Sequence, residues 1–346
     1  MMRGWHSLAL ACALSLAAAP AFAGKTPADS ARATPDKATQ ARDKAQLAFQ
    51  RDLVSVLAPN DDPQRLLGAA LLARPLFNQP PENSFHRLIE RATRADGADA
   101  ALFWAQLADC DAQADACPNA AALERLLGQA PDNAAAWLVK LGVDAHDMKQ
   151  DAAREDLAKA AAGKLYDDYT GTSLKALANA VGVLPPPPAA LDPAHPGGTA
   201  GMQAVLVFGL AGTQPQPSLP LVAKLCENAG DDASIRADCL KLGKTLEWGS
   251  SPLARSLGLH LREVLAKDPA QQQDARDARR HLVWQVQNFT RLLAQAQDEP
   301  ALAQHLLALA RNGGTETSLL LAALRDRNIP TEAPADWQPA GARSKK

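Results

Sequence analysis

The sequence predicts an all-α protein built of stacked helical hairpins, and three observations support this fold class. Apolar residues make up 47% of the 346 residues and are mainly Ala and Leu, which lose least on entering a helix. Aromatic residues make up only 4%, and no segment alternates apolar and polar residues as a half-buried strand does. Short apolar runs at helical spacing recur along the chain, separated by Pro, Gly and Asp.

The first 23 residues have the pattern of a secretory signal peptide. A basic start at Arg3 precedes an apolar run over 8–19, and small residues occupy positions 21 and 23 before the expected cleavage. That run is too short to span a bilayer as a stable helix. Cys12 weakly matches a bacterial lipoprotein box, so lipid anchoring there is the alternative to soluble export. We expect an exported protein, most consistent with the bacterial periplasm.

Composition divides the chain into segments with different expected behaviour. Residues 24–42 have no apolar periodicity, and four consecutive prolines at 185–188 stay extended and stiff. Whether that proline-rich segment separates two domains stays open. The expected division is a signal peptide (1–23), a disordered lead-in (24–42), a helical block (43–184), a Pro/Gly-rich linker or loop (185–199), a second helical block (200–329) and a flexible tail (330–346).

Each helix of the first block is predicted from an apolar stripe between turn or capping residues. Asp62-Pro63 suits a helix start, because Asp can cap and Pro fits the first turn. The acidic segment between Tyr166 and Tyr169 is interpreted as another start, with cation or sugar binding as the alternative. The expected helices cover 44–57, 62–75, 83–94, 98–110, 118–129, 134–145, 149–162 and 166–181.

The second block repeats the same signals. Gly249 can end one helix, and Ser251-Pro252 and Asp268-Pro269 can each open the next. The expected helices cover 201–210, 221–226, 233–248, 252–265, 271–296, 300–311 and 315–327.

The segment 98–164 contains two tryptophans 33 residues apart, Trp104 and Trp137, each followed by two apolar runs. It resembles about two degenerate tetratricopeptide repeats, although Lys140 stands where that family has Leu. The matching residues are Trp104, Leu107, Ala108 and Pro131 in the first unit, and Trp137, Ala153, Leu157 and Ala160 in the second. The resemblance implies an α-solenoid with a concave binding surface. Both tryptophans lie on apolar stripes and are expected to be packing anchors.

Four cysteines remain after the expected cleavage, and an even number in an exported chain predicts disulfides. Proximity in sequence favours Cys110 with Cys117 and Cys226 with Cys239, each across a predicted helix break. Sequence alone leaves the other connectivities open. Neither pair has the spacing of a zinc or redox motif, so no metal site is expected.

No catalytic or cofactor-binding motif is present, and the protein is expected not to be an enzyme and to need no cofactor. The formal net charge of −2 argues against a nucleic-acid partner. We expect binding of a protein or peptide in the cell envelope. One alternative is a helical cell-wall enzyme of the lytic-transglycosylase kind, with Glu247 beside Trp248 or Glu263 as its acid. The other is a structural envelope protein.

Overall fold

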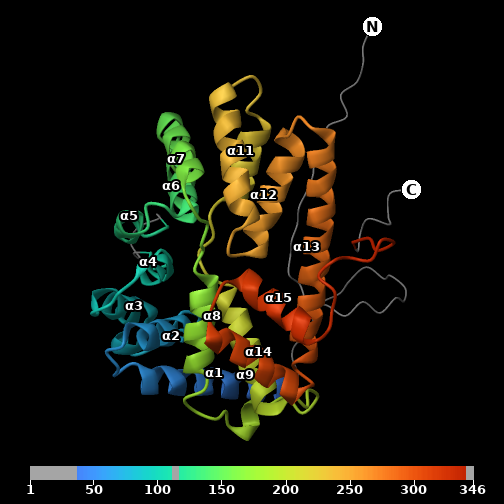
Figure 1. Ribbon diagram of the computed structural model, residues 1–346. Helices are drawn as coiled ribbons and strands as arrows, with labels where there is room; N and C mark the ends of the chain where they lie inside the picture. Colours follow the sequence, from blue (N-terminus) through green and yellow to red (C-terminus); the bar gives the residue numbers. More distant parts are fainter. Residues whose placement is uncertain (1–36, 111–116, 340–346) are drawn as a thin grey trace.

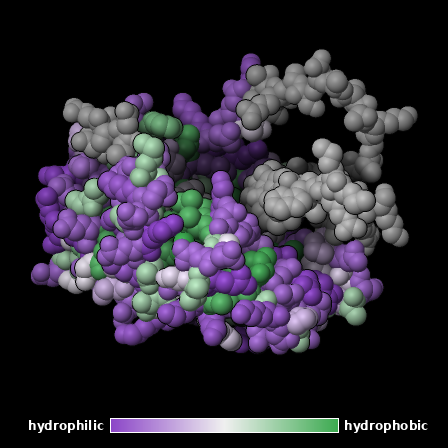
Figure 2. Space-filling view, turned by 90° about the horizontal axis from the view of Figure 1, so that it is seen from above, coloured by the Kyte–Doolittle hydropathy of each residue, from purple (hydrophilic) through white to green (hydrophobic). Residues whose placement is uncertain are grey.

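The computed structural model describes residues 37–110 and 117–339, and these residues fold into helices without a named strand. One isolated bridge pairs Asn133 with Leu165. The all-α prediction is therefore confirmed. No helix within the described ranges combines the length and the apolar character needed to cross a membrane. The face seen from above in Figure 2 is mostly hydrophilic, with hydrophobic side chains showing toward its middle.

Helix starts follow the capping residues that the sequence offers. The side chain of Asp62 accepts a hydrogen bond from the backbone N–H of Arg65. Asp99 likewise caps the helix that starts at Ala100. The helices of the first half are α1 (Lys37–Leu57), α2 (Pro63–Ala73), α3 (Phe85–Arg94), α4 (Ala100–Gln106), α5 (Ala120–Gln129), α6 (Ala134–His146), α7 (Gln150–Ala162) and α8 (Thr170–Ala180).

Proline in the first turn opens several helices of the second half, as it can do without losing a helical hydrogen bond. These helices are α9 (Gly198–Ala211), α10 (Leu219–Glu227), α11 (Ala233–Glu247), α12 (Pro252–Leu265), α13 (Pro269–Gln295), α14 (Pro300–Asn312) and α15 (Glu316–Asp326). Two short 3-10 helices, η1 (Pro81–Asn83) and η2 (Pro188–Ala190), lie in the connections.

The buried apolar residues form two cores. The lower core in Figure 1 joins α1–α3, α8, α9, α14, α15 and the end of α13. The upper core joins α5–α7 and α10–α12, and α4 contributes to both. Each core thus contains helices from both sides of residues 185–199. The two blocks expected from composition do not coincide with the two cores.

Contacts between helices distant in sequence hold the molecule together. α8 packs against α2, α9 and α14, and α7 packs against α11. The long helix α13 runs beside both cores: it contacts α12 in its upper part and α14 and α15 in its lower part (Figure 1). α13 therefore links the hairpin of α11 and α12 to the base of the molecule.

The segments expected to be loose make specific contacts where they are described. In 185–199, the buried Ala190 accepts a hydrogen bond from Gln46 Nε2 at 3.0 Å, so this segment is a loop packed on α1. The tail beyond α15 contacts α13 between Pro330 and Trp337. There the Trp337 and Trp284 rings meet edge to face, with centroids 5.4 Å apart.

Candidate functional site

A cavity of about 800 Å³ lies over α8. The start of α2 and the cap of α4 form one wall, and the connection between α14 and α15 forms the other. We call this cavity the α8 groove. The residues that line it are Leu57, Asp62, Gln64, Arg65, Asp99, Gly171, Thr172, Lys175, Ala176, Asn179, Ala180, Val183, Asn312, Gly313 and Gly314.

The floor of the α8 groove is one face of α8. Lys175 and Asn179 are exposed and lie four positions apart on α8, so they share a helix face, and the exposed Val183 follows the end of the helix. The opposite face is buried in the lower core through Leu174, Leu177, Ala178 and Val181. A helix that is packed on three sides thus offers its fourth, polar side to the cavity.

The charged side chains of the groove differ in how they are paired. The carboxylates of Asp62 and Asp99 serve as helix caps, and Asp99 also accepts a hydrogen bond from Gln64 Nε2 at 3.2 Å. Within the described ranges, Arg65 and Lys175 have no ion-pair partner within 4 Å. The groove therefore combines two available cations with two carboxylates already engaged by backbone N–H groups.

The second wall depends on glycine. Gly313 and Gly314 both have positive φ values, +79° and +107°, which L-residues with side chains rarely adopt. Gly171 lies against this turn, and a Cβ at 171 would overlap the carbonyl oxygen of Gly314. The close approach of α8 to this turn sets the shape of the groove.

A buried polar junction lies directly behind that contact, where three chain segments meet. The Ser250 hydroxyl donates to Asp168 Oδ1 at 3.0 Å, and the Ser250 N–H donates to the Tyr166 carbonyl at 3.0 Å. The N–H and the hydroxyl of Thr317 both donate to the Ser250 carbonyl, each at 3.0 Å. α8 starts at Thr170, later than expected, because 166–169 forms this junction and Tyr169 is left-handed.

Burial changes the protonation of the junction. Burial, reinforced by the nearby Asp168 charge, raises the pKa of Glu316 to about 7. Burial also raises the pKa of Asp167 above its ordinary value. Within the described residues no group of three or more His, Cys, Asp or Glu side chains is arranged to hold a metal ion. The hydrogen bonds of Ser250 to Tyr166, Asp168 and Thr317 tie the three segments together beside the groove.

The two expected packing anchors are in different environments. Trp104 is fully buried in the upper core, and its ring lies 5.6 Å from that of Tyr169. Trp137 is only partly buried: its Nε1 donates to the Pro131 carbonyl at 2.8 Å, and Lys159 Nζ lies 4.8 Å above the ring. Trp137 therefore packs at the edge of the upper core.

The cysteines are paired as proximity in sequence favoured. Cys110 and Cys117 form one disulfide and Cys226 and Cys239 the other, with Cα atoms 5.4 and 5.7 Å apart. The first joins the end of α4 to the start of α5. The second ties α10 to α11 and is fully buried.

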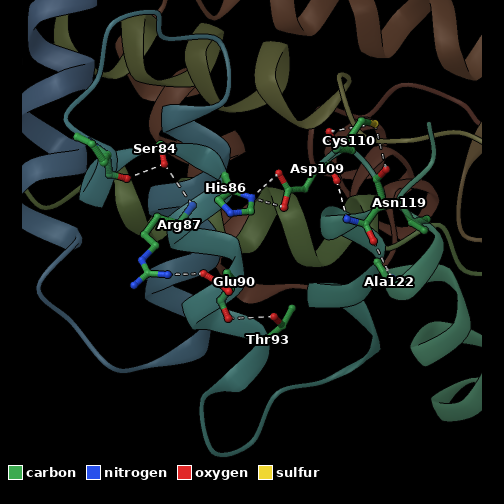
Figure 3. Close-up of polar contacts among 12 residues, drawn as sticks. Ser84, His86, Arg87, Glu90, Thr93, Asp109, Cys110, Asn119 and Ala122 are labelled. Carbon is green, nitrogen blue, oxygen red and sulfur yellow. Dashed lines mark hydrogen bonds and ion pairs between the residues drawn. The ribbon is translucent and has the colours of Figure 1, made fainter. Parts of the chain in front are cut away.

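A His–Asp pair lies beside the first disulfide (Figure 3). His86 Nδ1 lies 2.9 Å from Asp109 Oδ2, and the Asp109 carbonyl accepts a hydrogen bond from Asn119 at 2.6 Å. Such a pair could act as a general base if a nucleophile lay near it. Its neighbours are engaged otherwise: the Ser84 hydroxyl caps α3, and Cys110 is in the disulfide. The pair instead connects α3 to the loop after α4.

The two glutamates named for an enzyme lie on α11 and α12 and pair with different arginines. Glu247 lines a cavity of about 240 Å³ together with Trp248, and Arg262 Nε lies 3.2 Å from its carboxylate. Burial raises the pKa of Glu247. Glu263 pairs with Arg279 at 3.0 Å.

No protein-family model, no curated protein and no solved structure matches the chain. The site must therefore be interpreted from its own chemistry. The sequence did not single out Lys175 or Asn179, because an exposed stripe on a helix is the ordinary pattern of a solvated face. The nearest signal in the sequence is Gly313-Gly314, which predicts only a break between the helices expected at 300–311 and 315–327.

Proposed function

We propose that this protein is exported and binds an extended segment of another protein, or a peptide, in the α8 groove. One observation carries the proposal: the polar stripe of α8 opens into a cavity of about 800 Å³ that contains two cations with no ion-pair partner among the residues that the structure describes. The resemblance to tetratricopeptide repeats supports the binding of a protein or peptide. The disulfides and the signal-peptide pattern support an envelope protein, most consistent with the bacterial periplasm.

The groove residues suit a peptide ligand. The side-chain amides of Gln64, Asn179 and Asn312 can each donate and accept, as the main chain of an extended peptide requires. Arg65 and Lys175 can bind a carboxylate of the ligand, from an acidic side chain or from a chain terminus. The groove binds an extended segment by hydrogen bonds to its main chain and selects acidic groups by charge.

The test is crosslinked pull-down from periplasmic extract with the mature chain and two charge-reversal variants. Lys175→Glu should reduce the recovery of bound partners about tenfold or more, because about 1.4 kcal/mol of lost binding is a factor of ten. Arg154→Glu reverses an exposed charge on α7, away from the groove, and should bind like the unchanged protein. Equal recovery with Lys175→Glu would refute the groove as the binding site.

A cell-wall enzyme of the lytic-transglycosylase kind is the second candidate, favoured by the raised pKa of Glu247. The ion pair with Arg262 opposes it, because a general acid must hold a proton. Solubilisation of purified peptidoglycan by the unchanged protein but not by Glu247→Gln would establish this candidate. Absence of both captured partners and solubilisation would favour a structural envelope protein.

A further inference from the structure

Trp248 has the most exposed large apolar side chain in the described part of the molecule, at 86%. It follows the last residue of α11 and stands at the mouth of the cavity of about 240 Å³. Exposure on this scale removes Trp248 from the packing of the fold, unlike the buried Trp104. We call this cavity the Trp248 pocket. It lies among α11, α12 and α13, which stand side by side in Figure 1.

The floor of the Trp248 pocket is apolar. Leu259 of α12 and Ala278 and Leu282 of α13 line it, and Leu259 and Leu282 are buried. An apolar floor with an aromatic side chain at the rim suits the C–H face of a sugar ring, which stacks on aromatic rings through dispersion. The volume of the pocket matches one ring rather than a folded partner.

The polar wall is held in place before any ligand binds. Arg255 Nε donates to the Glu247 carbonyl at 2.9 Å, which fixes the guanidinium and leaves its two terminal nitrogens free to donate. The Glu247 side chain is 15% exposed, and within the described residues no donor of good hydrogen-bond geometry reaches its carboxylate. Gln285 adds an amide that can both donate and accept. A planar carboxylate, guanidinium or amide can form two parallel hydrogen bonds to two adjacent hydroxyls of a sugar ring.

The charged side chains of the Trp248 pocket favour a ligand with a negative charge. Arg255 and Arg262 line it together with one carboxylate, that of Glu247, so its charged side chains sum to a positive value. Arg262 is already engaged by Glu247 and by Asp274, the latter at 3.0 Å. Arg255 has no carboxylate partner within 4 Å in the described ranges and is the group available to a ligand anion.

We propose that the Trp248 pocket binds a carboxylate-bearing sugar residue of a glycan. Trp248 stacks on the ring, Arg255 pairs with the sugar carboxylate through its two terminal nitrogens, and Glu247 and Gln285 bind the ring hydroxyls. A guanidinium suits a carboxylate because its two parallel N–H groups match the two oxygens. This site shares no residue with the α8 groove and is independent of the function proposed for the groove.

The test is calorimetric titration of the mature protein with glucuronic-acid oligosaccharides and with neutral glucose oligosaccharides of equal length. The acidic oligosaccharide should bind at least about tenfold more tightly, because about 1.4 kcal/mol from one charge-assisted pair is a factor of ten. Trp248→Ala should weaken both ligands. Arg255→Gln should reduce the affinity for the acidic ligand to that for the neutral one.

Two controls separate lost contacts from lost folding. Phe77→Ala removes another highly exposed aromatic ring, 82% exposed, and should bind like the unchanged protein. Trp248→Phe keeps a stacking ring and should recover part of the affinity lost in Trp248→Ala. Equal affinity for acidic and neutral oligosaccharides, no binding of either, or unchanged binding by Trp248→Ala would each overturn the proposal.

Discussion

Lys140 connects α6 to α7 through two buried carboxylates. Its ammonium group contacts Asp144 on α6 and lies 3.7 Å from Asp156 on α7, and both carboxylates are buried. Burial raises the pKa of Asp156 to about 6. Burial also acts on Asp144, but its hydrogen bond to Lys140 and the charge of Lys140 outweigh this and lower its pKa. A leucine at 140 would remove the cation shared by both carboxylates and would leave Asp144 with only the more distant Lys149, 3.8 Å away.

Lys140→Met should therefore destabilise the protein strongly at neutral pH. Breaking a buried charge network by removing one partner costs about 3–5 kcal/mol. The loss should be smaller at about pH 5, where Asp156, with its raised pKa, takes up a proton and needs no cation. Urea unfolding at both pH values measures the difference. Lys164→Met, which removes an exposed pair with Asp132, should cost less than about 1 kcal/mol, and an equal loss in both variants would contradict the prediction.

Glu316 also makes the free energy of unfolding depend on pH, and its contribution decreases as the pH rises. Its folded pKa of about 7 lies above the ordinary value of 4.5, so the fold favours the protonated carboxyl. The stabilisation that the protonated carboxyl gives the folded state is complete below about pH 4.5, the ordinary pKa. It is lost as the pH rises through about 7, the folded pKa. Glu316→Gln keeps the neutral form at every pH and should raise the melting temperature at about pH 8 by several degrees, for about 1–3 kcal/mol.

The corresponding control is Glu124→Gln, which neutralises an exposed carboxylate on α5 and should leave the pH profile unchanged. At about pH 3.5, below the ordinary value of 4.5, the Glu316→Gln variant and the unchanged protein should melt together, because the group is then neutral in both the folded and the unfolded state. A melting temperature of Glu316→Gln at or below that of the unchanged protein at high pH would show that the carboxylate is stabilised by its surroundings.

At the scale of elements, many helices were predictable because their starts carry a capping side chain or a proline in the first turn. Asp62 caps α2 and Ser251 precedes Pro252 at the start of α12, as their sequence positions indicated. The expected helix at 98–110 was too long: α4 ends at Gln106, where the chain turns toward the first disulfide. Periodicity alone could not show that end, because Leu107 continues the apolar stripe although it lies beyond the helix.

The two disulfides should differ in their response to reductant. Cys226 and Cys239 are fully buried, whereas Cys117 is exposed, and thiol exchange requires access to a sulfur. Mild reductant should open Cys110–Cys117 first, as measured by alkylation and peptide mapping. Replacing Cys226 and Cys239 together by Ala should lower the free energy of unfolding by about 2–3 kcal/mol. If reductant opened Cys226–Cys239 before Cys110–Cys117, the prediction that access to sulfur decides the order would be wrong.

At the scale of the whole molecule, the contacts between distant helices could not be predicted. Nothing in the sequence of α7 or α11 shows that they pair, because both have ordinary amphipathic patterns and α8–α10 separate them in the chain. The α8 groove was missed for the same reason: Lys175 becomes a groove residue only because α2 and the turn at Gly313 are placed beside it. Local chemistry specifies helices, and the cavities arise from how the helices assemble.

The junction behind α8 predicts that the two cores unfold together. The segment 166–171 contacts Gly314 of the lower part through Gly171. It also contacts Ser250, whose hydroxyl bonds to Asp168 and whose backbone N–H donates to the Tyr166 carbonyl. Gly171→Ala introduces a Cβ that overlaps the Gly314 carbonyl oxygen and should cost about 1–3 kcal/mol. Gly209→Ala on α9 meets no atom within 4 Å and should stabilise the protein by up to about 1 kcal/mol through helix propensity.

Hydrogen exchange measured by mass spectrometry distinguishes shared from separate unfolding. In Gly171→Ala, amide protection should fall by the same factor in α2 and α14 of the lower core and in α6 and α11 of the upper core. A uniform loss is expected because α13 and the junction connect both cores, so neither can open without exposing apolar surface of the other. Loss of protection confined to the lower core would show that the junction transmits no stability between them.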